Sequence, residues 1–330
     1  MSALLLGLLL TRLVLAYARA RGLVDEPGPR RSHDVPVPRG GGLAIALALL
    51  PLLVLSGARE PTTVVFVASA LVIVVLGWAD DHRPLPVAWR LGIQTVLAVA
   101  AVVALGPVEK IVVAGHELSG AWLWSALAVV ALVWIVNLFN FMDGADGLAA
   151  TQAIISHLLF FAVFAGAGEP GLAWIALLVA CATTGFLFWN RPRATIFLGD
   201  SGSLLLGWSA AFLALAGAVT GVCSIWLSFV IISPFVVDAT ATLAWRVARG
   251  RRWYTPHRDH AYQFLIRAGW SHRRVLVHWV ALNGLLVAPA ALLANRKPLI
   301  DSGVAAAVGI ILLGAWYVVH FVVVKERMTT

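Results

Sequence analysis

Residues 121–147 read AWLWSALAVVALVWIVNLFNFMDGADG. Positions 121–136 carry no charged side chain, and crossing a bilayer as a helix takes about 20 predominantly apolar residues. Four polar side chains then follow at intervals of three: Asn137, Asn140, Asp143 and Asp146. The stretch predicts a membrane-spanning helix that ends in a polar functional cluster.

Apolar runs of this kind recur along the whole chain. Of its 330 residues, 61% are hydrophobic and 12% charged, whereas soluble domains have roughly 45–50% and about 25%. We therefore predict a single all-α polytopic membrane domain, residues 1–330, with about eleven transmembrane helices. The predicted spans are 2–18, 41–57, 62–79, 89–106, 121–137, 147–166, 171–189, 202–219, 223–246, 274–294 and 302–324. Residues 108–118 predict a small hairpin.

Basic side chains gather in alternate loops, which predicts the orientation because Lys and Arg are enriched in cytoplasmic loops. The richest loop follows the ninth predicted span and contains Arg246, Arg249, Arg251, Arg252, Arg258, Arg267, Arg273 and Arg274. The amino terminus is thus predicted outside and the carboxyl terminus in the cytoplasm. The net charge of +8 is spread over short loops without a nucleic-acid-binding module, so we expect no nucleic acid partner.

Two adjacent carboxylates, Asp80 and Asp81, stand where the third predicted span ends. They are candidates for binding a divalent cation or accepting a proton from a phosphate; a solvated helix end is the alternative. Arg90 and Gln94, one helical turn apart on the next span, could hold a lipid phosphate beside them or anchor the helix at the membrane surface.

The cluster from Asn137 to Asp146 predicts a binding pocket. A helix end would stack its polar residues along one side, and the glycines Gly144 and Gly147 allow close approach of a ligand to the backbone. A third cluster contains Phe197 and Asp200. Magnesium prefers oxygen ligands, which Asp200 together with Asp80 or Asp81 could supply; we predict Asp200 and Asp80 as ligands of Mg²⁺, with Mn²⁺ as an alternative. Asp200 could instead be a helix cap.

The late loop carries His257, Arg258, His260 and Gln263. Two histidines beside several arginines favour a diphosphate clamp over a zinc site, because no third ligand stands nearby. All of these clusters fall on the predicted cytoplasmic side, which favours an active site there. A transporter of lipid-linked sugars, the main alternative from another class, would be expected to place charged residues near the bilayer midplane.

Together the motifs resemble the polyprenyl-phosphate N-acetylhexosamine-1-phosphate transferase superfamily, glycosyltransferase family 4. The resemblance spans nearly the whole chain, with the motifs in the expected order. It includes a first cytoplasmic loop with Asp25, Pro27, Arg30, His33, Pro36, Pro38 and Gly40 to Gly42. The resemblance implies transfer of a sugar 1-phosphate from a UDP-N-acetylhexosamine to undecaprenyl phosphate, with release of UMP, at a bacterial inner membrane.

The resemblance also implies roles for individual residues. Asp200 would bind magnesium, Phe197 would stack on uracil, and Asp80 and Asp81 would lie beside the metal and the lipid phosphate. The predicted catalytic residues are Asp80, Asp81, Asp143, Asp146, His257 and His260. The predicted substrate-binding residues are Arg39, Arg90, Asn137, Asn140, Phe197, Arg258 and Gln263. Related enzymes are often dimers, so we keep a homodimer as an expectation.

The late loop bears on the subfamily. The peptidoglycan branch, which transfers phospho-N-acetylmuramoyl-pentapeptide, typically has consecutive histidines there, whereas residues 257–263 read HRDHAYQ. This run looks more like the transferases that initiate O-antigen synthesis with UDP-GlcNAc, UDP-FucNAc or UDP-QuiNAc. We therefore expect a role in O-antigen or other cell-envelope polysaccharide synthesis, with the peptidoglycan enzyme as the alternative.

Overall fold

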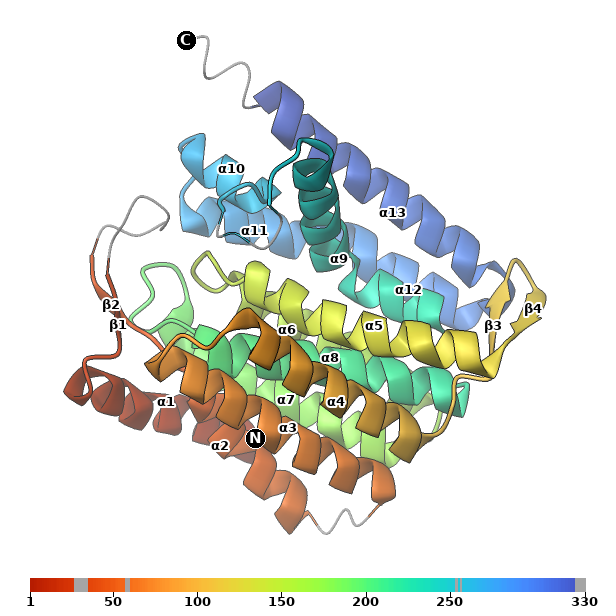
Figure 1. Ribbon diagram of the computed structural model, residues 1–330, viewed down its shortest axis with the longest axis horizontal. Coiled ribbons are helices and arrows are strands. Elements are labelled where there is room, and N and C mark those ends of the chain that lie inside the picture. Colours follow the sequence, from red (N-terminus) through yellow and green to blue (C-terminus); the bar gives the residue numbers. More distant parts are fainter. Residues whose placement is uncertain (27–34, 57–59, 253–254, 256, 324–330) are drawn as a thin grey trace.

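The computed structural model describes residues 1–26, 35–56, 60–252, 255 and 257–323. It is built almost entirely of helices (Figure 1). The helices are α1 (Ser2–Ala20), α2 (Gly42–Leu55), α3 (Pro61–His82), α4 (Val87–Leu105), α5 (Ala121–Phe141), α6 (Leu148–Gly166), α7 (Pro170–Asn190), α8 (Gly199–Thr220), α9 (Ile225–Ala248), α10 (Ala261–Arg267), α11 (His272–Leu282), α12 (Ala288–Arg296) and α13 (Asp301–Val318). A π-helical segment, Asn283–Val287, joins α11 to α12.

In the described part of the chain, 10 helical stretches are long and apolar enough to cross a bilayer, counting residues 272–296 as one. The prediction of an all-α polytopic membrane protein is confirmed. The predicted span 41–57 corresponds to α2, which has only 14 residues. At about 1.5 Å per residue it reaches about 21 Å, short of the roughly 30 Å hydrocarbon core.

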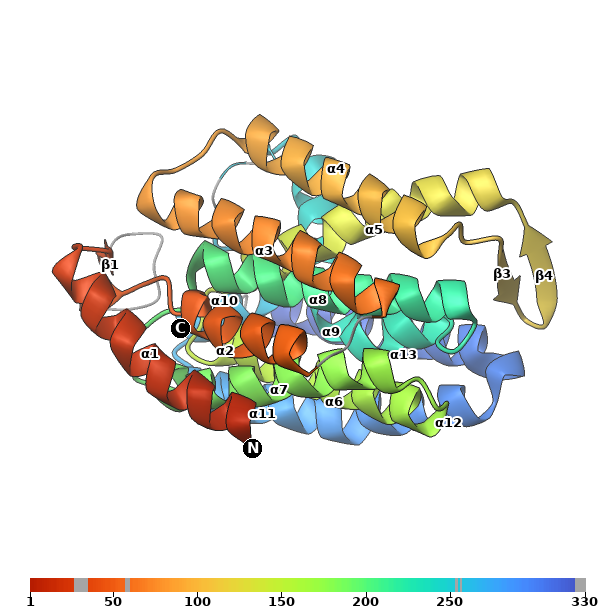
Figure 2. The ribbon, with the colours of Figure 1, turned by 90° about the horizontal axis from the view of Figure 1, so that it is seen from below.

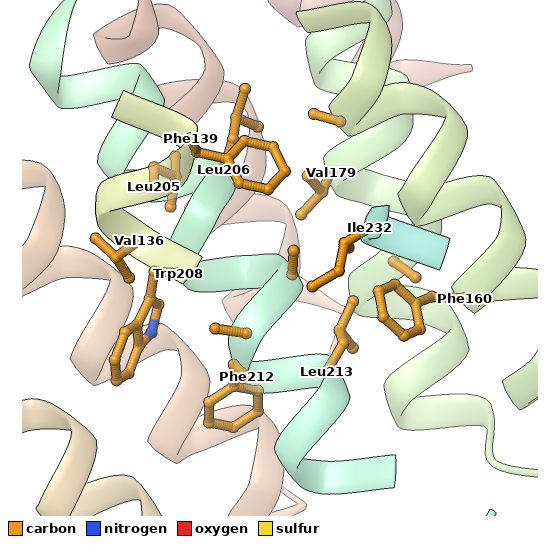
Figure 3. Packing of buried hydrophobic residues seen from close by; sticks show 14 of the residues in the cluster. Val136, Phe139, Phe160, Val179, Leu205, Leu206, Trp208, Phe212, Leu213 and Ile232 are labelled. Carbon is orange, nitrogen blue, oxygen red and sulfur yellow. The ribbon is translucent and has the colours of Figure 1, made fainter. Parts of the chain in front are cut away.

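Helix α8 lies at the centre of the bundle, between α3 on one side and α6 and α7 on the other (Figure 2). Its buried side chain Trp208 lies beside Val136 of α5, and Leu206 lies beside Phe139 of α5 (Figure 3). Phe212 packs edge-to-face on Phe66 of α3, with ring centroids 5.2 Å apart. Trp208 also donates its indole N–H to the Ser69 hydroxyl of α3 (3.0 Å). A buried tryptophan thus finds a polar partner inside the apolar core.

Glycines let the starts of α2 and α8 and the last turns of α3 come together. A Cβ at Gly77 of α3 would lie 2.5 Å from both the Asp200 carbonyl oxygen and Ser201 Cα, and one at Gly42 would overlap Gly202. Small residues permit such close helix packing in membrane proteins. This contact brings Asp81 close to Asp200. We call this end of the bundle the cavity end, because the cavity described below opens there.

Helix α9 bends at Pro234, which lacks the N–H that would pair with the Val230 carbonyl. The Ser233 hydroxyl donates to that carbonyl instead (2.8 Å). Helix α9 packs against α13 and leads into the late loop (Figure 1). The bend therefore positions the loop that the sequence analysis singled out.

The opposite end of the bundle carries the predicted hairpin. Strands β3 (Lys110–Val113) and β4 (His116–Ser119) pair antiparallel, while β1 (Val24–Asp25) and β2 (Val37–Pro38) form a separate pair near the cavity end. The Trp226 indole donates to the Val112 carbonyl (2.5 Å), and the Ala114 amide donates to Ser302 (3.0 Å). The hairpin is thereby fixed to the starts of α9 and α13.

Several helix ends differ from the prediction. Asp80 and Asp81 lie in the last turn of α3, and Asp200 lies in the first turn of α8. The predicted stacking of four polar residues on one helix end is wrong for two of them, because α5 ends at Phe141 and leaves Asp143 and Asp146 in the following loop.

We expect Gly77→Ala to destabilise the protein, because the added Cβ would collide with the backbone of α8. Overpacking of this kind costs about 1–3 kcal/mol, so the unfolding midpoint in detergent should fall. Gly92→Ala on α4 is the matched control, since a Cβ there meets nothing within 4 Å. Its midpoint should stay the same or rise slightly. Equal midpoints for the two variants would contradict the packing argument.

Candidate active site

A cavity of about 290 Å³ opens at the cavity end of the bundle. It brings together segments that are far apart in the sequence. Its lining consists of Asp25, Arg39, Asp81, Phe141, Asp143, Gly144, Ala145, Asp146, Asn190, Phe197, Gly199, Asp200, Tyr262, Gln263 and His272. The predicted clusters thus meet in one place.

The carboxylate of Asp81 caps helix α8. It accepts hydrogen bonds from the backbone amides of Asp200 (2.9 Å) and Ser201 (3.1 Å) and is only 3% exposed. The first amides of a helix lack partners within the helix, so a carboxylate there satisfies them. The cap of α8 is therefore Asp81 rather than Asp200, the predicted alternative.

Asp80 is also engaged within the protein. Its carboxylate accepts from the Leu85 amide and from the Arg90 guanidinium, both at 2.6 Å. These bonds fix the turn between α3 and α4 and place Arg90 beside the acidic pair. The predicted role of Asp80 as a metal ligand remains a prediction; its carboxylate is paired with Arg90 here.

Asp200 is the more open carboxylate, with its side chain 31% exposed. Asn140 donates to its Oδ1 (2.6 Å) and also to Ser203 (3.0 Å), while Arg90 Nη1 lies 3.9 Å from its Oδ2. Asp200 is thus oriented from one side and accessible from the other. Such a carboxylate suits a hard cation that takes one or two protein oxygens and otherwise binds substrate phosphates.

The cavity concentrates negative charge. Burial, together with the charges of Asp81 and Asp146, raises the pKa of Asp143 to about 7. Among the described lining residues Arg39 is the single Arg or Lys, and its guanidinium donates to the Asp81 carbonyl (2.6 Å). Within the described residues no three His, Cys, Asp or Glu side chains are grouped to hold a metal by themselves. The residues present therefore fit a magnesium ion that shares its coordination with substrate phosphates.

The late loop reaches the cavity through residues other than its histidines. The His260 ring is 2% exposed and stacks behind the ring of Tyr262, with centroids 6.1 Å apart. Gln263 accepts the His260 amide through Oε1 (3.2 Å), which leaves its amide nitrogen beside Gly144. Gln263, a predicted site residue, lines the cavity; Tyr262, which the sequence analysis did not select, lies next to it.

The other predicted residues of this loop lie outside the cavity lining. Burial, followed by the neighbouring His260 and Arg246, lowers the pKa of His257 to about 4. His257 is therefore uncharged at neutral pH and can offer hydrogen bonds but no positive charge. Burial and nearby Arg267 also lower the pKa of Arg258.

Helix α9 holds the late loop through side chains four residues apart. Asp238 accepts from the Ala261 amide (2.9 Å) and from Thr242 (3.2 Å), and Arg246 forms an ion pair with Asp259. Sequence reasoning missed this row. Polar residues at a helical period inside an apolar span are the signal that could have revealed it.

Asp146 connects three segments. Its Oδ2 accepts from the amides of Arg193 (3.0 Å) and Ala194 (3.2 Å), and its Oδ1 lies 3.2 Å from His272 Nδ1 at the start of α11. His272 lines the cavity but was not selected from the sequence, since a single histidine carries no pattern.

A separate groove of about 310 Å³ lies between α4 and α5 and shares Phe141 with the cavity. Arg90 and Asn137 line it among apolar side chains. Gln94, predicted to act with Arg90, is 1% exposed and accepts from Asn137 (2.7 Å). Gln94 therefore does not line the groove but holds the side chain of Asn137, which does.

The first predicted loop contributes through its second half. The Phe197 amide donates to the Pro38 carbonyl (2.8 Å), and the Gly41 amide donates to the Phe197 carbonyl (2.9 Å). A Cβ at Gly41 would collide with the Phe186 ring, so this position requires a residue without a side chain. The predicted residues Pro27, Arg30 and His33 lie outside the described residues.

Comparison with known proteins shows the family to which the chain belongs. A family model described as glycosyl transferase family 4 matches residues 63–218. The chain is 32% identical to a probable undecaprenyl-phosphate N-acetylglucosaminyl 1-phosphate transferase of Bacillus subtilis, over 82% of this chain and 77% of the relative.

Two further relatives carry names of the same kind. A decaprenyl-phosphate N-acetylglucosaminephosphotransferase of Mycobacterium leprae is 31% identical, over 81% of this chain and 76% of its own length. An undecaprenyl-phosphate alpha-N-acetylglucosaminyl 1-phosphate transferase of Escherichia coli K12 is 25% identical, over 97% and 93%. The motif order, the shared cavity and these similarities agree: the chain belongs to glycosyl transferase family 4 and is a membrane-embedded sugar-phosphate transferase.

Proposed function

We propose that the protein transfers an N-acetylhexosamine 1-phosphate from a UDP-sugar to undecaprenyl phosphate and releases UMP. One observation carries this proposal: the carboxylate-rich cavity and the apolar groove between α4 and α5 share Phe141. A charged, water-soluble donor suits the cavity, and a lipid acceptor suits the groove. The reaction would take place where the two meet.

The groove supports a lipid acceptor in two ways. Arg90 is its cationic residue, within 2.6 Å of Asp80 and 3.9 Å of Asp200. Trp134 lines both this groove and a second apolar cavity of about 310 Å³ among α5, α8 and α9. A phosphate at Arg90 could therefore be followed by a long apolar chain along α5.

In the cavity, Phe197 offers a flat face for a base, and Arg39 and the Gln263 amide offer hydrogen-bond donors. Asp200, oriented by Asn140, would hold the magnesium ion, and Asp143 is a further carboxylate that lines the same cavity. Bound there, Mg²⁺ would neutralise part of the charge of the donor diphosphate. The chain's own residues position the reactants and keep the carboxylates fixed, which is the main source of catalysis when two anions react.

The proposed step is an in-line displacement. An oxygen of the lipid phosphate forms a bond to the sugar-proximal phosphorus of the donor, the bond from that phosphorus to the bridging oxygen breaks, and UMP leaves with that oxygen. A phosphate monoester has a second pKa near 6, so the acceptor is mostly ionised at neutral pH without a dedicated base. This agrees with Asp80 and Asp81 both being hydrogen-bonded within the protein.

The donor we favour is UDP-GlcNAc or a 6-deoxy relative. The relatives' names specify N-acetylglucosaminyl transfer, and the wall of the cavity contains Tyr262 and Gln263 in the loop where the peptidoglycan branch typically carries consecutive histidines. We propose a role in starting O-antigen or another cell-envelope polysaccharide.

The first test is UMP release by purified protein with undecaprenyl phosphate, Mg²⁺ and a panel of UDP-sugars. We expect release with UDP-GlcNAc, UDP-FucNAc or UDP-QuiNAc. Asp200→Asn should lower the rate at least about hundredfold, since each 1.36 kcal/mol of lost stabilisation is about tenfold.

Asp301→Asn is the control for this test, because Asp301, like Asp200, is an aspartate in the first turn of its helix but lies at the start of α13, near the hairpin. It should retain activity if it folds. Release only with UDP-MurNAc-pentapeptide would assign the protein to the peptidoglycan branch, and no release with any donor would contradict the proposal.

The raised pKa of Asp143 predicts a pH dependence for magnesium. An ordinary aspartate ionises near 3.9, whereas Asp143 is half protonated at about pH 7. Because the ionised form attracts the cation, the magnesium concentration for half-maximal rate should fall as the pH rises from 6 to 8. In Asp143→Asn this dependence should flatten. An unchanged slope in the variant would show that Asp143 does not take part.

Arg90→Gln tests the acceptor site. Hydrogen bonds to charged groups are worth about 1.5–3 kcal/mol, so the KM for undecaprenyl phosphate should rise roughly ten- to hundredfold. The KM for the donor should change little. Thr95→Ala, in the same groove, should leave both constants near wild type. A rise confined to the donor KM would indicate that Arg90 binds the donor and would contradict its assignment to the acceptor site.

A further inference from the structure

The turn between α7 and α8 contains an unusual backbone conformation. Arg193 has φ = +64°, and the only other non-glycine residue with positive φ among those described is Ala114 in the hairpin turn. A side chain makes the left-handed region unfavourable, so a residue stays there only when its surroundings require it. The surroundings of Arg193 therefore need an explanation.

Asp146 provides the main hydrogen bonds to the apex of this turn. One carboxylate oxygen, Oδ2, accepts from the amides of both Arg193 (3.0 Å) and Ala194 (3.2 Å). The base of the turn is closed separately, because the Thr195 amide donates to the Trp189 carbonyl (2.9 Å). The two successive amides can converge on one oxygen only while the apex keeps its left-handed form.

Asp146 is itself held in place. Its backbone amide donates to His272 Nδ1 (3.2 Å), its Oδ1 lies 3.2 Å from the same nitrogen, and its side chain is 11% exposed. The next residue, Gly147, has φ = +73° and donates its amide to Asn190 Oδ1 (3.1 Å) at the end of α7. Both carboxylate oxygens of Asp146 thus contact protein groups, and its own loop is fixed to α7.

The turn leads directly to the cavity. Asn190 donates to the Ile196 carbonyl (2.9 Å), and the next residues include Phe197 and Asp200, which line the cavity. A change at the apex would therefore loosen the segment that carries Phe197 and Asp200, leaving the bonds to Pro38, Gly41 and Asp81 as its remaining anchors. It would not shift Arg90, which lies on α4.

We infer that Asp146 is a positioning residue: its carboxylate holds Arg193 in the left-handed conformation and so fixes the turn that leads to Phe197 and Asp200. It acts together with the bonds that Pro38 and Gly41 make to Phe197 and that Asp81 makes to Asp200. This differs from the catalytic role predicted from the motif. Its kinetic consequences rest on the proposed function, whereas its structural consequences do not.

The experiment combines Asp146→Ala with Arg193→Gly, alone and together. Glycine adopts positive φ without a steric penalty, so it removes the need for the carboxylate. Asp146→Ala should raise the donor KM and the magnesium requirement while leaving the acceptor KM unchanged. Arg193→Gly alone should be near wild type, and in the Asp146→Ala background it should recover roughly tenfold of the lost kcat/KM.

Two further measurements separate positioning from chemistry. Asp146→Asn keeps an oxygen for the two amides, so it should retain far more activity than Asp146→Ala. Amide hydrogen exchange of residues 191–199, followed by mass spectrometry, reports the turn without requiring catalysis. Protection should fall in Asp146→Ala and return when Arg193→Gly is added.

The inference is overturned if glycine restores neither protection nor activity, or if Asp146→Asn is as inactive as Asp146→Ala. Either result would indicate that the charge acts on the substrate or the metal. If protection behaves as expected but the wild type releases no UMP, the positioning role stands and the proposed reaction fails. Unfolding midpoints in detergent identify any variant that fails to fold.

Discussion

Two hydrogen bonds, from the amides of Asp200 and Ser201 to the buried carboxylate of Asp81, join the end of α3 to the start of α8. A carboxylate at a helix start satisfies unpaired amides and interacts favourably with the helix dipole. The contact depends on Gly77 and Gly199, where a Cβ would strike α8 or Asp81. Because α8 is the central helix, this junction determines how the cavity is placed relative to the whole bundle.

Five aspartates in and beside the cavity divide into two groups. Asp80, Asp81 and Asp146 accept hydrogen bonds from backbone amides and hold the helix ends and turns. Asp143 and Asp200 both line the cavity. Among the described residues, no backbone amide donates to either carboxylate, and Asp200 accepts from the Asn140 side chain. A site that holds a cation with few protein oxygens needs only Asp143 and Asp200. The carboxylates of Asp80, Asp81 and Asp146 keep the site rigid.

The sequence predicted the features that depend on composition and motif order: the apolar spans, the hairpin and the meeting of the polar clusters. It could not predict that Asp81 caps α8, because that bond joins residues more than a hundred positions apart. Tyr262 and His272 were missed because each is a single residue at the start of a helix, α10 or α11, and belongs to no repeating polar pattern. The helical series failed at Asp143 because Gly144 and the residues after Phe141 leave the helix, which spacing alone does not reveal.

A transferase that joins a soluble donor to a lipid must bring two anions together at the membrane surface. Arg90 lies in the groove wall, is fixed by Asp80 and is 3.9 Å from Asp200, so its charge stands between the groove and the cavity. A free arginine would lose side-chain entropy on binding a phosphate, whereas one already held by a carboxylate has lost most of it. In the proposed reaction, the pairing of Asp80 with Arg90 would explain how an acidic residue can favour the binding of an anionic lipid: it fixes the cation that attracts the lipid phosphate.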